Sequence, residues 1–291
     1  MKQKVLVILG PTSTGKTTLA IRLAKEFNGE IINADAFQVY KELNIGVNKP
    51  TLNEQKQIKF HLLNEVSIKD KWDIKEFQDK AYKCIEMIIS NNHLPIICGG
   101  SSMYVDTLIK NYDLSKSPQR TNTYDHLDAK RLYTMLSKYD KDLADKNVGN
   151  HKRLARALEI ATNSEYESHL VKQPMYDFKI ILTSIEDRKV LYDKINSKVD
   201  QMIKEGWVDE VKSLMKINDL SSLNAFKAIG YLQIYNSIVD ESKLDLDLIK
   251  QKSRRYAKRQ ITWNKNHYSD YISFNQNNYN DVVDQVRKWI K

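Results

Sequence analysis

A short loop near the N-terminus constrains the fold of this chain more than any other feature of its sequence. The run GPTSTGKT, residues 10–17, matches the pattern G-x-x-x-x-G-K-[ST]. It follows an apolar run, Val5–Leu9, and precedes a segment, Thr17–Phe27, with large apolar residues four positions apart. A strand, this loop and a helix in that order form the context in which such loops bind phosphate. The pattern therefore predicts a phosphate-binding loop in an α/β protein.

The loop residues suggest how a phosphate would be bound. Backbone N–H groups of a glycine-rich loop converge on the phosphate, at the positive end of the following helix. Lys16 would add a full positive charge, and the Thr17 hydroxyl is placed to coordinate Mg²⁺. The candidate phosphate-binding residues are Gly10, Pro11, Thr12, Ser13, Thr14, Gly15, Lys16 and Thr17.

The rest of the chain predicts a parallel sheet flanked by helices. Further strands are expected at Glu30–Ala34, Leu94–Cys98, Phe178–Thr183 and Tyr271–Phe274, with helices at Ile74–Asn91 and throughout 186–268. This alternation indicates an α/β fold like that of the phosphate-loop NTPases. The polar, helical segment 113–177 lacks strand signals and is expected to be an inserted helical domain, with a linker at Ser115–Pro118. The core domain would then comprise 1–112 and 178–291.

Two strand ends add candidate site residues, while the usual hydrolase motifs are missing. Asp35 follows the second expected strand, and Ser101 follows the third. Ligands of parallel sheets bind at these carboxyl ends, so Asp35 could be a general base, an indirect metal ligand or simply a turn former. No later strand ends in the metal-binding Asp of nucleotide hydrolases, and no guanine-reading motif follows a strand. A transferase or small-molecule kinase is therefore favoured over a hydrolase.

Charge and composition favour a polyanionic partner. The formal net charge is +9, and the segment from Lys250 to Ser269 has seven Lys or Arg residues and no acid. Such a segment is typical of nucleic-acid binding, although a solvated helix face has the same pattern. Cys84 and Cys98 form no disulfide framework or metal motif, and no apolar run approaches the roughly 20 residues of a membrane span. We therefore expect a cytoplasmic protein without a membrane partner, and nothing requires more than a monomer.

Two basic helices contain candidate anion-binding side chains. Arg153 and Arg156 share one face of an expected helix and could clamp phosphates. Arg254 and Lys258 form a row beside Arg259, which fits phosphates of a ligand or of RNA. In the same helix, Ile249, Tyr256 and Trp263 recur every seven residues and are expected to form a buried stripe.

These segments together resemble the bacterial tRNA dimethylallyltransferase family. The matching blocks occur in order over most of the chain: GPTSTGKT, NADAFQVYKELNIGVNKP, GGSSMYVDTLI, KRLARALEI, FKAIGY and YAKRQITW. The resemblance implies transfer of a dimethylallyl group from dimethylallyl diphosphate to N6 of adenosine 37 in tRNAs that read codons beginning with U. The partners would be the tRNA anticodon stem-loop and the prenyl donor, with Mg²⁺ as cofactor.

The resemblance also implies roles for individual residues. Asp35 would be the general base, Lys16 would neutralise the leaving diphosphate, and Thr17 would bind Mg²⁺. Ser101 stands where the family usually has Thr, and keeps the catalytic hydroxyl. Lys227 and Arg254 would help to hold the diphosphate. The implied tRNA contacts are Asp35, Ala36, Phe37, Gln38, Ser101, Lys152, Arg153, Leu154, Ala155, Arg156, Lys258 and Arg259.

Some residues depart from the family pattern, and three other functions remain in competition. Ser102 replaces a glycine, and Gly149–His151 replaces Asn-Asp-Pro at the start of a helix. A small-metabolite kinase would share the loop and Asp35 but would have no use for the basic helix. A relative that prenylates free adenine nucleotides would need neither that helix nor the insertion. A non-catalytic RNA-binding protein would have no need of Lys16, Thr17 and Asp35.

Overall fold

The computed structural model describes residues 2–114, 120–163, 173–275 and 277–291. It divides into two compact units, Met1–Ile109 with Pro174–Lys291, and Lys110–Gln173. The second unit overlaps the predicted insertion, 113–177, and the first contains all the strands of the described residues. The linker predicted at Ser115–Pro118 lies outside the described residues.

The first unit is built on a parallel sheet, as the sequence predicted. In the described residues the sheet has six strands in the order β3-β2-β4-β1-β5-β6, and every neighbouring pair is parallel. The strands are β1 (Lys4–Leu9), β2 (Gly29–Asn33), β3 (Phe60–His61), β4 (Leu94–Gly99), β5 (Asp177–Thr183) and β6 (Ile272–Phe274). The two-residue strand β3 was not predicted. Because β1 lies between β4 and β5, the loop that follows it leaves the centre of the sheet.

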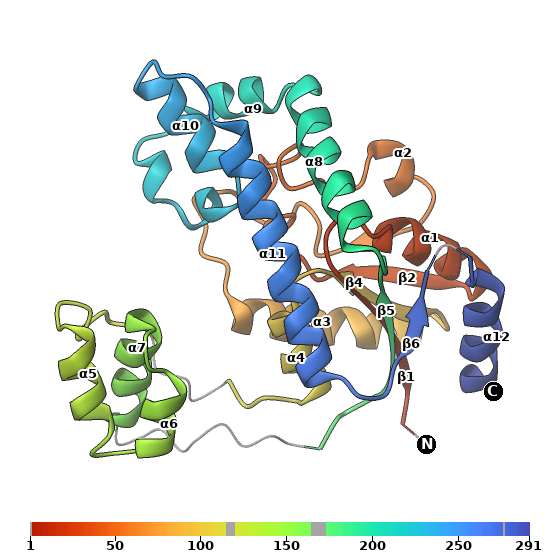
Figure 1. The fold of residues 1–291 in the computed structure, drawn as a ribbon. Coiled ribbons are helices and arrows are strands. Elements are labelled where there is room, and N and C mark those ends of the chain that lie inside the picture. The colour runs from red at the N-terminus through yellow and green to blue at the C-terminus, as the bar shows by residue number, and fades with distance from the viewer. Residues whose placement is uncertain (1, 115–119, 164–172, 276) are drawn as a thin grey trace. The chain divides into compact units, whose positions relative to one another are not determined.

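Helices pack on both faces of the sheet (Figure 1). Successive strand residues alternate between the faces, so Leu6 and Ile8 of β1 belong to one hydrophobic cluster while Val7 and Leu9 belong to the other. The first cluster is completed by α1 (Lys16–Glu26) and α12 (Tyr279–Ile290). The second contains α3 (Ile74–Ser90) and α4 (Ser102–Ile109). Near-continuous apolar strands are what a sheet covered on both faces requires.

The expected helical region 186–268 is a layer of several helices with breaks. It consists of α8 (Arg188–Lys204), α9 (Trp207–Leu214), short 3₁₀ turns at Leu220–Ser222 and Asn224–Lys227, α10 (Tyr231–Val239) and α11 (Leu246–His267). A further short helix, α2 (Leu52–Gln55), lies in the loop after β2. The expected buried stripe on α11 is only partly right. Ile249 is buried, but Tyr256 and Trp263 are half-buried. Towards the C-terminal end of the helix, the buried side is formed by Ala257, Gln260 and Asn264.

The second unit is a small helical domain with its own core. It contains α5 (Ala129–Leu136), α6 (Lys141–Lys146) and α7 (His151–Ala161), which pack through Leu132, Leu136, Ala144, Leu154 and Leu158. Each helix begins with a side-chain cap: Asp128, Asp140 and Asn150 accept hydrogen bonds from backbone N–H groups of the first turn. Asn150 thus caps α7 although the sequence there departs from the family pattern.

The described residues contain no helix that is both long and apolar enough to cross a bilayer. Within the same residues, no group of three or more His, Cys, Asp or Glu side chains is arranged to hold a metal ion. Cys84 and Cys98 are both free thiols, as expected from their number and spacing.

Candidate active site

The phosphate loop has a conformation that its neighbours fix. It leaves the end of β1 at Gly10 and enters α1 at Lys16. A Cβ atom at Gly10 would lie 2.1 Å from Thr183 Oγ1 at the end of β5, so only glycine fits there. Thr14 is buried and its hydroxyl donates to the Pro11 carbonyl (2.8 Å), with Thr183 Oγ1 at 2.5 Å. Gly10, Pro11 and Thr14 therefore stabilise the backbone conformation of the loop.

The other loop residues line a cavity of about 970 Å³. Thr12, Ser13, Gly15, Lys16 and Thr17 form one part of its wall. The same cavity is lined by the residues after β2, namely Asp35, Phe37 and Gln38. The structure therefore brings the predicted phosphate loop and the predicted base into one cavity, at the carboxyl ends of the strands.

Asp35 is held by the turn that it begins. Its Oδ1 accepts hydrogen bonds from the backbone N–H groups of Phe37 (2.9 Å) and Gln38 (3.3 Å). Burial raises the pKa of Asp35, and the two N–H groups and the charge of Lys16 oppose that shift only in part. No hydrogen bond to Oδ2 occurs within the described residues. A positioned carboxylate with a raised pKa is suited to accept a proton.

Two other titratable groups share the interior of the cavity. Burial lowers the pKa of Lys16, and the carboxylate of Asp35 opposes that shift. The Lys16 ammonium donates to the Pro11 carbonyl at 2.7 Å. Burial also raises the pKa of Cys98 to about 12, so this thiol is protonated near neutral pH and is not a nucleophile.

Apolar side chains line the same cavity. They come from the loop after β2, from α8 and from the residues near α9 and α10: Ile45, Val47, Ile195, Val199, Met202, Trp207 and Ile229. Trp207 and Val199 are nearly inaccessible and belong to the main hydrophobic cluster. The cavity is therefore lined both by the phosphate loop and by apolar side chains.

A single carboxylate of α9 holds the loop that forms part of this wall. Glu210 Oε2 accepts hydrogen bonds from the backbone N–H groups of Asn44 (2.9 Å) and Ile45 (2.8 Å). Its Oε1 accepts from Gly46 N–H (3.4 Å) and from the hydroxyl of Tyr231 (2.6 Å). Glu210 thus orders a loop whose three N–H groups would otherwise need water or another acceptor.

Replacing Glu210 with alanine is expected to lower kcat/KM by roughly 10–100-fold, because hydrogen bonds to a charged group contribute about 1.5–3 kcal/mol to the ordered loop. The loop that lines the cavity would be ordered in a smaller fraction of the molecules, which weakens binding of ligands in the cavity. The KM for such a substrate should therefore rise more than kcat falls. Steady-state kinetics would measure this. Asp209→Ala, at an exposed position of the same helix, is the matched control. Equal kinetics for both variants would contradict the role of Glu210.

The sequence has close relatives over nearly its whole length. The family model described as IPP transferase matches residues 38–267. The chain is 42% identical over 282 residues to the tRNA dimethylallyltransferase of Malacoplasma penetrans, covering 94% of this chain and 93% of that one. This chain belongs to the IPP transferase family. A similar enzyme from Oceanobacillus iheyensis is 37% identical over 282 residues, covering 91% and 89% of the two chains.

Solved structures of IPP transferases have the same fold. The full-length tRNA isopentenylpyrophosphate transferase of Bacillus halodurans superimposes with a TM-score of 0.74 and 30% identity, over 99% of this chain and 96% of that one. A eukaryotic dimethylallyltransferase, solved acting on tRNA, gives a TM-score of 0.77 and 28% identity, over 90% of this chain and 70% of that one. The α/β fold predicted from the sequence is therefore the fold of the family.

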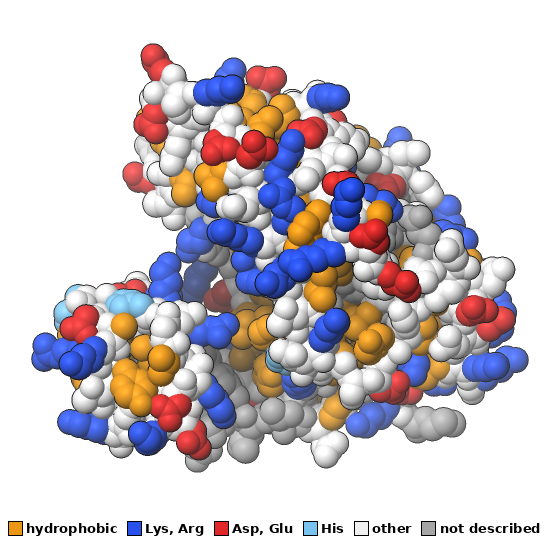
Figure 2. Space-filling view, in the orientation of Figure 1, with side chains coloured by type: hydrophobic (Ala, Val, Ile, Leu, Met, Phe, Trp, Pro, Cys, Tyr) orange, Lys and Arg blue, Asp and Glu red, His pale blue; other side chains and the backbone are white. Residues whose placement is uncertain are grey.

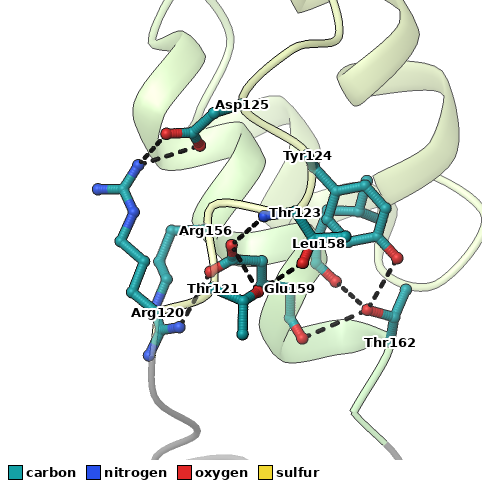
Figure 3. Close-up of polar contacts among 9 residues, drawn as sticks. All are labelled: Arg120, Thr121, Thr123, Tyr124, Asp125, Arg156, Leu158, Glu159 and Thr162. Carbon is teal, nitrogen blue, oxygen red and sulfur yellow. Dashed lines mark hydrogen bonds and ion pairs between the residues drawn. The ribbon is translucent and has the colours of Figure 1, made fainter.

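The structure separates the RNA contacts predicted on α7 into exposed and buried residues. Leu154 and Ala155 lie in the core of the helical unit, with 1% and 0% of their surface exposed, so the prediction is wrong for these two side chains. Arg156 is half-buried and pairs with Glu159 at 3.1 Å (Figure 3). Lys152 and Arg153 are exposed, and both stay candidates for contact with RNA.

Glu159 is the centre of a polar cluster that joins α7 to the segment before α5. The buried carboxylate accepts hydrogen bonds from the Thr121 hydroxyl (3.2 Å) and from Thr123 N–H (3.1 Å), in addition to its pairing with Arg156 (Figure 3). Because a buried carboxylate requires such partners, the guanidinium of Arg156 stabilises this unit. It is less available to an external phosphate than the sequence suggested.

The basic residues predicted near α11 also differ in position. Lys and Arg side chains gather along the exposed side of this helix (Figure 2). Arg259 and Lys227 line the cavity, whereas Arg254 and Lys258 do not. Arg254 is half-buried and donates to Asn196 Oδ1 on α8 at 2.6 Å. Its predicted contact with the diphosphate thus lacks support from the geometry, while Lys258 remains exposed to solvent.

The remaining predicted residues lie in the two turns next to Asp35. Ser101 Oγ accepts a hydrogen bond from Ala36 N–H at 3.0 Å, so the two predicted residues touch each other. Gln38 donates through Nε2 to the carbonyls of Val47 (3.1 Å) and Asn48 (3.0 Å) and so fixes the wall loop. Ser102, the departure from the family glycine, donates to Asn264 Oδ1 on α11 at 3.0 Å.

Proposed function

We infer that this chain is a tRNA dimethylallyltransferase, which transfers the dimethylallyl group of dimethylallyl diphosphate to N6 of adenosine 37. The tRNAs would be those that read codons beginning with U, and the site of action would be the cytoplasm. The observation that carries this inference is a single cavity with three parts: the phosphate loop, the Asp35 carboxylate and an apolar wall. A kinase would use the first two parts, but a prenyl diphosphate also needs the third.

The reaction follows from the arrangement of these parts. N6 of the adenine attacks the allylic carbon of the donor, and the bond from that carbon to the diphosphate oxygen breaks. The diphosphate leaves with both electrons of that bond, beside Lys16 and the N–H groups of the loop. Asp35 takes the proton that N6 loses, which its position and raised pKa allow. The apolar wall would hold the dimethylallyl chain and keep water from the allylic carbon.

Mg²⁺ fits this site as a partner of the diphosphate. The Thr17 hydroxyl is an oxygen donor in the same cavity, and oxygen ligands are those that Mg²⁺ prefers. When bound, Mg²⁺ would neutralise charge on the leaving diphosphate.

The test of this function is prenyl transfer to RNA. Purified protein is incubated with dimethylallyl diphosphate, Mg²⁺ and an unmodified tRNA that carries adenosines at positions 36 and 37. Mass analysis of the nucleosides should show a dimethylallyl group on adenosine 37. Transfer to AMP but not to tRNA would support a free-nucleotide prenyltransferase, and ATP-dependent phosphorylation without prenyl transfer would support a kinase. Either result would overturn the proposal.

The exposed basic side of α11 makes a separate prediction about RNA affinity. Lys258→Ala is expected to weaken tRNA binding and to reduce the slope of log K against log salt by about 1, because one phosphate contact is lost. The KM for dimethylallyl diphosphate should stay unchanged, since Lys258 lies outside the cavity lining. Binding is measured over a salt series. Lys288→Ala, at an exposed lysine of α12, is the control. A salt slope for the Lys258 variant equal to that of the wild type would refute the contact.

A further inference from the structure

A glutamine of α11 joins the phosphate loop to the turn after β4. Gln260 is 4% exposed, although it belongs to a helix whose neighbouring residues Lys258 and Arg259 are exposed. Its Oε1 accepts a hydrogen bond from Thr12 N–H at 3.0 Å, and its Nε2 donates to the Gly100 carbonyl at 2.9 Å. A donor on one side and an acceptor on the other fix the orientation of the amide.

Further hydrogen bonds connect the turn after β4 to Ala36, the residue that follows the predicted base Asp35. Tyr256, one turn earlier on α11, donates from its hydroxyl to the Gly100 carbonyl at 3.3 Å, and Ser101 follows Gly100 in the chain. Burial raises the pKa of Tyr256, so its hydroxyl is protonated at neutral pH and can donate. Ser101 Oγ in turn accepts from Ala36 N–H at 3.0 Å, one residue after Asp35.

At this junction the Gln260 amide lies close to the backbone of Gly100. A Cβ atom at Gly100 would lie 2.4 Å from Gln260 Nε2, so the close approach of the amide requires glycine. The Ser101 N–H donates to the Ala34 carbonyl at 3.2 Å, which ties the turn after β4 directly to the end of β2. Three strand ends, those of β1, β2 and β4, are thus held together through one helix.

We propose that Gln260 is a positioning residue that sets the distance between the donor's diphosphate and the acceptor's base. It acts through Thr12 on the phosphate loop, and through Gly100, Tyr256 and Ser101 on the turn that begins at Asp35. This inference rests on the proposed function, because it concerns the alignment of the two substrates of that reaction. Loss of the bridge leaves both binding surfaces present but misaligned, and a misplacement of about 1 Å can lower a rate by roughly 10²-fold.

The first test is Gln260→Met, which keeps the size of the side chain and removes both hydrogen bonds. We expect kcat to fall by about 10²-fold with little change in the KM for either substrate. Hydrogen exchange of the wild type and the variant gives a readout that does not depend on prenyl transfer: the Thr12 amide should exchange faster in the variant. Gln251→Met, at an exposed position of the same helix, is the matched control.

The second test is Gln260→Glu, read as a pH profile. The introduced carboxylate can still accept from Thr12 N–H, but its second oxygen faces the Gly100 carbonyl and repels it. Once protonated, the carboxyl donates to that carbonyl as the amide does, so the ratio of the variant's kcat to the wild-type kcat should rise as the pH falls. The cavity is also lined by other charged side chains, which both proteins share, so the wild-type pH profile is measured beside that of the variant: Lys16, Asp35, Lys49, Glu54, Lys198, Glu205, Lys227 and Arg259.

Three results would overturn the proposal. A Gln260→Met variant with wild-type kcat and wild-type exchange at Thr12 would show that the bridge positions nothing. A variant in which fewer molecules are folded, but each folded molecule has the wild-type kcat, would show a purely structural role. A kcat ratio for Gln260→Glu that does not change with pH would contradict the hydrogen bond to Gly100. Failure of the proposed function is seen separately, as absence of prenyl transfer by the wild type.

Discussion

Replacing Asp35 with asparagine is expected to lower kcat by roughly 10²–10⁴-fold, the usual contribution of a general base. Asparagine keeps the shape of the side chain and an oxygen that can accept from Phe37 and Gln38 N–H, but it cannot take the N6 proton. Binding of tRNA should change little, because the turn is preserved. Single-turnover prenylation with saturating tRNA would measure the chemical step directly.

The same substitution should not destabilise the protein near neutral pH. Burial raises the pKa of Asp35, so the folded state binds its proton more tightly than the unfolded state. The stability that this group contributes is fully present below its unfolded pKa and is lost as the pH rises through its folded pKa. At neutral pH the ionised carboxylate therefore costs stability, and the Asp35→Asn protein should have a Tm at least as high as the wild type.

A pH profile gives a further check on Asp35. Since the base works only when deprotonated, wild-type kcat should rise with pH through the raised pKa of Asp35. This limb should be missing from the residual activity of the Asp35→Asn variant. Asp79→Asn, on the exposed side of α3, is the control and should behave as the wild type does. Near-normal turnover in the Asp35 variant would remove this residue as the base.

The parts of the site that lie within one stretch of chain could be predicted from the sequence. Residues 10–15 form the loop between β1 and α1, and both of these elements have strong local sequence patterns, so the loop and its place in the sheet could be predicted directly. Asp35 was located because the ends of parallel strands meet at one edge. Strand β3 was missed since its two residues, Phe60 and His61, are too few to show any periodicity.

The parts formed by contacts far apart in the chain could not be predicted in this way. Glu210 accepts hydrogen bonds from the N–H groups of Asn44 and Ile45, and Gln260 accepts one from Thr12. The residues next to Glu210 and Gln260 in the sequence do not indicate these distant partners. The false RNA contacts at Leu154 and Ala155 have a different cause. The resemblance implied contact by every residue from 152 to 156, whereas the helical period puts Leu154 on the apolar side with Leu158.

The Lys16→Met variant is expected to lose roughly 10²–10³-fold in kcat/KM for the prenyl donor, the effect of removing one preorganised charge from a transition state. Lys16 lies in the loop that would hold the diphosphate, and negative charge develops there as the allylic bond breaks. Inhibition by added diphosphate should weaken, and the KM for the prenyl donor should rise. Affinity for tRNA should stay near that of the wild type, because the side chain lies inside the cavity and not on the exposed basic side of α11.

Stability should again move in the opposite direction to activity. Burial lowers the pKa of Lys16, so the folded state disfavours its charged form, and this cost is present at every pH below the lowered value. Stability is regained as the pH rises from that value towards the ordinary pKa of lysine. Methionine removes the buried charge, so the Tm of the variant near neutral pH should not fall below that of the wild type. Lys25→Met, exposed in the last turn of the same helix, is the control. A low Tm together with lost activity would mean that Lys16 supports the fold of the loop, whereas lost activity in a stable protein assigns its charge to the leaving diphosphate.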